Sequence, residues 1–140
     1  MNQYPYIIAP ILGWLVAQSI KFALTLRKDG LQWGDAVQSG GMPSSHSAFM
    51  AALSTVIALQ QGIGSVAFGI AFSLTAVIVY DAMGVRRTTG QQTEAIKELA
   101  KAAKHQLATK VTVSRGHTPA EVTVGGFIGI IIGLAVNAIL

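Results

Sequence analysis

The chain has 140 residues, of which 51% are hydrophobic and 11% charged, and its mean hydropathy is +0.53. Soluble domains carry roughly 25% charged residues, so this composition predicts a membrane protein, and the length fits a single domain over residues 1–140. The net charge is +4, but basic residues of a membrane protein have a topological explanation, and we expect no nucleic acid as partner. The chain has no cysteine, which excludes disulfides, thiolate nucleophiles and cysteine-ligated metals.

Four hydrophobic segments predict membrane-spanning helices, because a bilayer core needs about 20 apolar residues in a helix. The segments cover residues 4–26, 47–60, 64–80 and 122–140. The second is short for a span, and with the third it predicts a helical hairpin around a turn rich in Gln and Gly. The predicted fold class is therefore an all-α polytopic membrane bundle of about four spanning helices.

Two further helical features accompany these segments. Residues 93–107 are polar but carry apolar side chains at steps of three and four residues, which predicts a cytoplasmic surface helix. The last hydrophobic segment carries Gly125, Gly129 and Gly133 at four-residue spacing. Glycines at this spacing are typical of a close-packing helix face, and this face is a candidate interface for a homo-oligomer.

Charge predicts the orientation of the bundle. Seven of the ten basic residues lie in the stretch 86–115, and the side that carries the chain termini and the turn near residue 60 has none. Cytoplasmic loops carry the excess of Lys and Arg, so the charged face is predicted to be cytoplasmic. We therefore expect a multi-pass integral membrane protein, in the cell membrane if the source is bacterial.

A run rich in glycine and serine, GGMPSSHS at residues 40–47, stands where a loop enters a hydrophobic segment. Such a loop presents free backbone N–H groups at a helix N-terminus, which is a common basis of phosphate binding. On this interpretation Ser44 and Ser45 belong to the phosphate loop and His46 lies beside the anion. The alternative is that Ser44 or Ser45 only caps the helix and that His46 is an interfacial histidine.

A second run, GHTPAEV at residues 116–122, precedes the last hydrophobic segment. Thr118 as N-cap, Pro119 at the first helical position and Glu121 two residues later predict a capping box. That motif does not explain His117. A histidine just before a helix, with a carboxylate one turn later, predicts a nucleophile or base that Glu121 holds in one tautomer.

Basic side chains near these runs predict phosphate binding. Arg86 and Arg87 form a pair able to hold phosphate through bidentate hydrogen bonds, or alternatively are topology determinants that flank a helix. Asp81 is a candidate partner for one of them. Lys21 lies inside an apolar helix, where a lysine either snorkels or faces a site, and Lys28 shares its helix face if the helix continues that far.

Together, the runs SGGMPSSHS (39–47), YDAMGVRR (80–87) and GHTPAEV (116–122) resemble the type 2 phosphatidic acid phosphatase superfamily, which includes the vanadium haloperoxidases. The closer resemblance is to the small divergent branch of that superfamily, from about Lys21 to the last helix. It implies that His46 is the acid, His117 the nucleophile and Glu121 the carboxylate that orients it. The phosphate-binding residues that it implies are Lys21, Lys28, Ser44, Ser45, Arg86 and Arg87.

The sequence departs from the superfamily pattern at several positions. Ser45 stands where the superfamily has glycine, and Glu121 stands where it has aspartate. Val111 occupies the place of an arginine expected six residues before the nucleophile, so that role passes to the arginines at 86–87. In the first motif, at residues 21–29, Lys-Asp replaces the expected Arg-Pro.

The resemblance implies a hydrolase of the acid phosphatase or lipid phosphate phosphatase type, which forms a phosphohistidine. Its partners are the lipid bilayer and an amphiphilic phosphate substrate, such as a lipid or prenyl phosphate monoester or pyrophosphate. Basic side chains take the role that a divalent ion has in other phosphatases, so no metal and no other cofactor is expected. One alternative is a non-catalytic membrane protein on the same fold that binds phosphorylated lipids or a protein partner. A transporter or channel subunit is disfavoured, because no ionisable residue lies mid-membrane away from the charged face.

Overall fold

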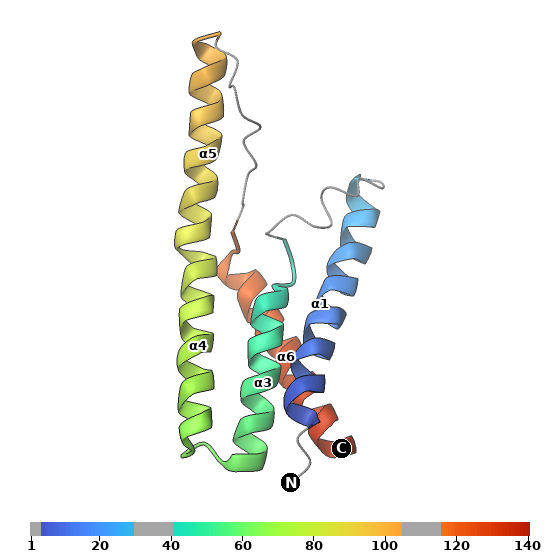
Figure 1. The fold of residues 1–140 in the computed structure, drawn as a ribbon. Coiled ribbons are helices and arrows are strands. Elements are labelled where there is room, and N and C mark those ends of the chain that lie inside the picture. The colour runs from blue at the N-terminus through green and yellow to red at the C-terminus, as the bar shows by residue number, and fades with distance from the viewer. Residues whose placement is uncertain (1–3, 30–40, 105–115) are drawn as a thin grey trace.

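The computed structural model describes residues 4–29, 41–104 and 116–140, without the side chains of residues 27–29 (Figure 1). Over these ranges α-helix is the only regular secondary structure, so the prediction of an all-α membrane bundle is confirmed. The helices are α1 (Pro5–Asp29), α3 (Ser45–Gln61), α4 (Val66–Met83), α5 (Val85–Ala102) and α6 (Pro119–Ile139).

α3 is the central helix of the bundle. It packs against α1, α4 and α6, and α1 also packs against α6. The start of α1, the end of α6 and the turn between α3 and α4 lie at one end of the bundle, whereas α3 and α6 both begin at the opposite end (Figure 1). The N-termini of α3 and α6 therefore face the same region, which is where the predicted site residues lie.

The glycine face of α6 packs against α3. A Cβ atom added to Gly125 or Gly129 would collide with the backbone carbonyl of Ser44 or Ala48, and at Gly133 it would lie 2.9 Å from a carbonyl oxygen one turn further along α3. The prediction of a close-packing helix face is confirmed. Because α3 of the same chain covers this face, the glycines are not available as an interface between copies, and a homo-oligomer stays a prediction without an assigned surface.

Three helical segments of the described structure are long and apolar enough to cross a membrane: Pro5–Leu26, Val66–Ala102 and Pro119–Ile139. α3 has 17 residues, which at 1.5 Å per residue rise about 26 Å, short of the roughly 30 Å of a bilayer core. Three of the about four predicted spans therefore have full length, and α3, which the sequence predicts to be short, is a shorter helix in the centre. The chain is an integral membrane protein.

α5 differs from the surface helix predicted at residues 93–107. It begins at Val85 and continues beyond the bundle along the line of α4 (Figure 1). Helical hydrogen bonding runs through the junction, since the Gly84 N–H donates to the Tyr80 carbonyl at 2.8 Å and the Thr88 N–H donates to the Gly84 carbonyl at 2.9 Å. The helix therefore projects from the bundle instead of lying across it. The last residues of the predicted helix, 105–107, are outside the described ranges.

Candidate functional site

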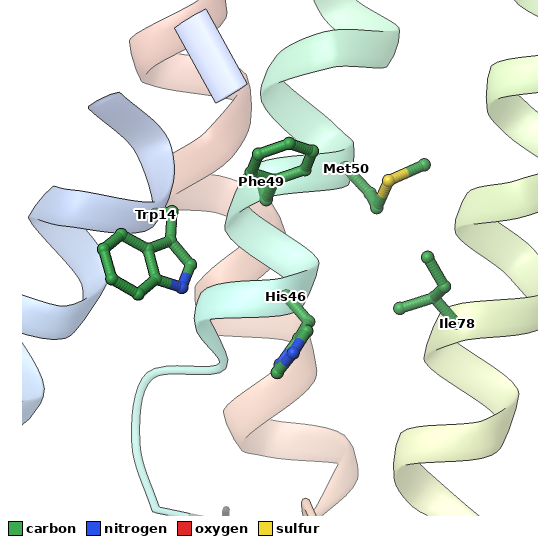
Figure 2. A pocket seen from close by; sticks show the side chains of 5 residues that line it. All are labelled: Trp14, His46, Phe49, Met50 and Ile78. Atoms are coloured by element: carbon green, nitrogen blue, oxygen red, sulfur yellow. The ribbon is translucent and has the colours of Figure 1, made fainter. Parts of the chain in front are cut away.

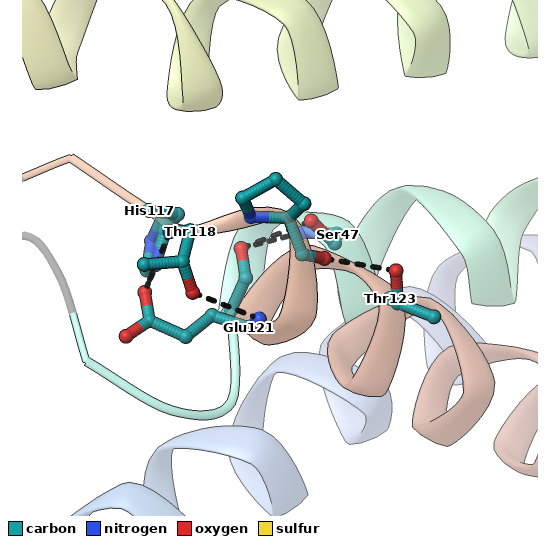
Figure 3. Close-up of polar contacts among 7 residues, drawn as sticks. Ser47, His117, Thr118, Glu121 and Thr123 are labelled. Atoms are coloured by element: carbon teal, nitrogen blue, oxygen red, sulfur yellow. Dashed lines mark hydrogen bonds and ion pairs between the residues drawn. The ribbon is translucent and has the colours of Figure 1, made fainter.

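His117 and Glu121 form one hydrogen-bonded unit at the start of α6 (Figure 3). The His117 side chain is 5% exposed, and its Nδ1 lies 3.1 Å from Glu121 Oε2. The same carboxylate oxygen accepts the Thr118 N–H at 3.1 Å, and Thr118 Oγ1 accepts the Glu121 N–H at 3.3 Å. The predicted capping box is confirmed. Glu121 therefore caps the helix and fixes the imidazole with one carboxylate.

The segment that carries His117 is held against the junction of α4 and α5. The His117 N–H donates to the Ala82 carbonyl at 2.9 Å. Gly116 has φ +61°, and a Cβ atom there would lie 2.5 Å from the Arg87 nitrogen and 3.0 Å from the Arg86 carbonyl carbon. This close backbone contact, which only glycine permits, brings the paired arginines beside the histidine.

The serine-rich loop is held against the first turns of α6. Ser44 is fully buried, and its N–H donates to the Glu121 carbonyl at 3.1 Å. Its Oγ accepts hydrogen bonds from Ser47 Oγ at 2.9 Å and from the Ser47 N–H at 3.4 Å, so Ser44 is the N-cap of α3. Ser45 is the buried first residue of the helix, and His46 follows with an exposed side chain. The use of Ser44 and Ser45 as phosphate ligands stays a prediction.

Lys21 reaches the site from α1. It is only 7% exposed, and its Cε would lie 3.9 Å from a Cβ atom on Gly41, at the start of the serine-rich loop. The Lys21 ammonium also interacts electrostatically with Glu121. Lys21 therefore faces the site, whereas Lys28 lies in the last turn of α1 with its side chain outside the described part of the structure.

The electrostatics connect both histidines to the same cations. The pKa of His117 lies below its ordinary value because of burial, against the opposing hydrogen bond and charge of Glu121. The pKa of His46 is also lowered, by partial burial, then by the positive charge of Arg86, and then by the His117 ring when that ring is protonated. Lys21 lowers the pKa of both histidines as well. The site thus gathers groups from α1, α3, α5 and the segment before α6.

The two arginines are not equivalent. Arg86 Nε donates to Asp81 Oδ2 at 2.6 Å, which confirms the predicted pairing of Asp81 with one of them. Arg86 lowers the pKa of both His46 and His117, so its charge acts on the site. Arg87 is exposed, and its contact with the site is through its backbone.

Within the described ranges, no group of three or more His, Asp or Glu side chains is placed to hold a metal ion. Lys21 and Arg86 bring cationic side chains to the candidate site, and their use as phosphate ligands stays a prediction. Val111, the residue in place of the superfamily arginine, lies outside the described ranges.

The model of the divergent PAP2 family matches residues 2–132 of this chain. The chain belongs to the divergent PAP2 family. It is 34% identical over 140 aligned residues to the uncharacterized membrane protein YuiD of Bacillus subtilis (strain 168), and the match covers 90% of this chain and 87% of the relative. No solved structure matches the chain.

Two structural features of this member of the divergent PAP2 family could not be predicted from the sequence. One is the contact of Gly116 with the start of α5, because a single glycine before a histidine does not reveal its φ angle. The other is Gln18 on α1, whose Oε1 is buried without a hydrogen-bond partner in the described part of the chain. Gln18 follows Trp14 by four residues and precedes Lys21 by three, so the three share one face of α1.

Proposed function

We propose that this protein is a membrane phosphatase that cleaves a lipid or prenyl phosphate monoester or pyrophosphate through a phosphohistidine. The observation that carries the proposal is the buried His117, held by Glu121 among the cations Lys21 and Arg86 and within electrostatic reach of His46. Buried imidazole, orienting carboxylate and nearby cations are the parts that a histidine nucleophile requires at an anionic phosphorus centre.

His117 acts as the nucleophile. Because Glu121 accepts the proton on Nδ1, the lone pair of the neutral ring lies on Nε2, and the lowered pKa favours that neutral form near pH 7. The Nε2 lone pair attacks phosphorus, a P–N bond forms, and the P–O bond to the leaving group breaks. Glu121 stabilises the positive charge that develops on the ring.

His46 acts as the proton donor and later as the base. In its protonated form it passes a proton to the leaving oxygen, which departs as an alcohol or as a phosphate ester. The neutral His46 then takes a proton from water as the water oxygen attacks phosphorus. The P–N bond breaks, its electron pair returns to His117 Nε2, and inorganic phosphate leaves.

The positive potential for phosphate binding comes from two sources. Lys21 and Arg86 supply full charges, and the N-termini of α3 and α6 supply partial positive charge. Such fixed charges stabilise the extra negative charge on the equatorial oxygens in the transition state. The substrate is amphiphilic, because the site lies at one end of a membrane bundle.

The site faces the cytoplasm in this proposal. The positive-inside rule supports this orientation, because the side with the chain termini and the α3–α4 turn carries no basic residue. The cysteine-free chain permits a direct test with single-cysteine variants and a membrane-impermeant maleimide. Ile63→Cys, at a turn residue that is 77% exposed, should be labelled in intact cells. Lys101→Cys on α5 should be labelled only after lysis, and the reverse pattern would overturn the orientation.

The test of the proposed activity is phosphate release by the purified, detergent-solubilised protein from a panel of lipid and prenyl phosphates. Release should disappear in His117→Ala, with thermal melting measured in parallel to show that the variant is folded. Turnover retained in the folded variant would exclude the phosphohistidine route. Vanadate binding by the wild type without release from any substrate would favour the non-catalytic protein that binds phosphorylated lipids.

A further inference from the structure

A cavity of about 400 Å³ lies next to His46 (Figure 2). Its volume is within the roughly 300–1,000 Å³ typical of ligand pockets. Apart from the His46 ring, the side chains that line it are apolar or aromatic: Trp14 on α1, Phe49 and Met50 on α3, and Ile78 on α4. The cavity is therefore an apolar space that borders the candidate site at His46.

The apolar residues lie deeper in the bundle than the charged ones. Phe49 and Met50 follow His46 by three and four residues, which is one helical turn toward the end with the chain termini. Trp14 precedes Lys21 by seven residues, or about 10 Å along α1. From His46 the cavity therefore runs away from the charged end and into the apolar part of the bundle.

The cavity is also open to the side. α3 contacts both α1 and α4, but α1 and α4 have no contact with each other over the described ranges. The cavity lies between those two helices with α3 as its floor (Figure 2). A chain that is already in the bilayer is able to enter it sideways.

α1 provides continuity between the cavity and the cations. Trp14, Gln18 and Lys21 share one face of this helix, in that order from the cavity to the site. The Gln18 Oε1 is buried without a partner in the described part of the chain, the state expected of a group that binds water or a ligand.

We propose that this cavity holds a single alkyl or isoprenoid chain on the leaving group of the phosphorylated substrate. The inference rests on the proposed function. If His46 protonates the leaving oxygen, the carbon attached to that oxygen lies at the mouth of the cavity, and the chain continues along Phe49 and Met50. A volume of about 400 Å³ equals roughly a dozen groups of water size, about 30 Å³ each, which suits one chain and not two side by side.

The kinetic test uses n-alkyl phosphates from ethyl to octyl, which stay monomeric in water. The wild-type kcat/KM should rise with chain length, by up to about fourfold for each buried methylene. Ile78→Phe narrows the cavity and should flatten this rise in kcat/KM with chain length. The matched control is Val77→Phe, at a side chain that is 64% exposed and does not line the cavity; it should keep the wild-type slope. An equal slope in both variants would overturn the inference.

A binding test separates this inference from the proposed activity. In a Trp33→Phe background, 8-bromooctylphosphonate, which cannot be hydrolysed, should quench Trp14 fluorescence, and 1-bromooctane at the same concentration should quench it less. Ile78→Phe should weaken the quenching and Val77→Phe should not. Selective quenching without any turnover would support the chain site and refute the phosphatase. Equal quenching by both bromo compounds, or none, would overturn the chain site whatever the activity.

Discussion

Replacing Gly116 by alanine should damage both the stability of the protein and its site. The residue has φ +61°, and the left-handed region costs a non-glycine residue about 1–2 kcal/mol. The new Cβ would also lie 2.5 Å from the Arg87 nitrogen, which is closer than the minimum of about 3.0 Å that Cβ atoms keep from other heavy atoms. Relief of this overpacking costs a further 1–3 kcal/mol or so. We therefore expect Gly116→Ala to lose about 2–5 kcal/mol of unfolding free energy.

The same collision moves the groups that we propose to be catalytic. To bring the Cβ contact from 2.5 to 3.0 Å, the His117 segment and the start of α5 must separate by about 0.5 Å, which is the tolerance of a productive catalytic geometry. We expect kcat/KM for phosphate release to fall about 10- to 100-fold in protein that is still folded. Thermal unfolding in detergent, together with the kinetic assay at a temperature where the variant is folded, measures both effects.

Gly62→Ala is the matched control. Gly62 has φ +85°, but no atom lies within 4 Å of an added Cβ, and it caps the C-terminal end of α3, whereas the candidate site lies at the N-terminal end of that helix. Its ψ of +154° places the backbone in a region that is essentially restricted to glycine, so this variant should lose the cost of the backbone strain, about 1–3 kcal/mol, and keep wild-type kcat/KM. If Gly116→Ala had the same unfolding free energy and the same kcat/KM as Gly62→Ala, the inferred close contact between the His117 segment and the arginine pair would be refuted.

Three further predictions concern the charges of the site. Arg86→Gln should lower kcat/KM by about 100-fold, and Arg87→Gln should change it only a few-fold, because only Arg86 acts on both histidines; similar losses in both would contradict this distinction. Glu121→Gln should lower kcat by about 100-fold or more, and it should shift the acidic limb of the pH–rate profile to lower pH, because the carboxylate raises the pKa of His117. Finally, kcat/KM should be highest below pH 6.5, the ordinary pKa of histidine, because the pKa values of both His46 and His117 are lowered. Activity should fall at lower pH because His117 becomes protonated, and it should fall at higher pH because His46 loses its proton. With p-nitrophenyl phosphate, whose leaving group needs no proton, kcat/KM should no longer fall as the pH rises. With an alkyl phosphate, a kcat/KM that is constant from about pH 6.5 to 8.5 would exclude His46 as the proton donor.

Much of the fold follows from the sequence, because hydrophobic length and helix caps are local signals. The capping box at Thr118 needs only three neighbouring residues, and the glycines of α6 need only their four-residue spacing. The direction of α5 could not be predicted in this way. A glycine such as Gly84 is compatible with a break or with a continuous helix, and the hydrogen bonds across it decide between them.

The candidate site is only partly local. The sequence identifies the histidines and their motifs, but it does not distinguish Arg86 from Arg87, because that difference depends on which side chain turns toward Asp81. The cavity beside His46 has no sequence signal either. Its lining comes from three helices, and apolar residues such as Trp14 and Ile78 are indistinguishable in a hydrophobic segment from those that face lipid.

The register of the helices explains how distant residues meet. Gln61 Nε2 donates to the Tyr6 hydroxyl at 3.0 Å, so the end of α3 is level with the beginning of α1. Lys21 follows Tyr6 by 15 residues and His46 precedes Gln61 by 15, so two antiparallel helices with equal rise bring the lysine and the histidine to the same depth.

α6 is fixed to the same frame by its glycines, which face Ser44, Ala48 and Ala52 at equal four-residue steps. A single register thus aligns Lys21, the N-terminus of α3 and the N-terminus of α6. In the proposed site, the positive potential arises from helix length and close packing as much as from any motif, so the proposal does not require an arginine at position 111. A bulky side chain at Gly129, far from the phosphate, should therefore weaken vanadate binding by moving one helix terminus away from the other.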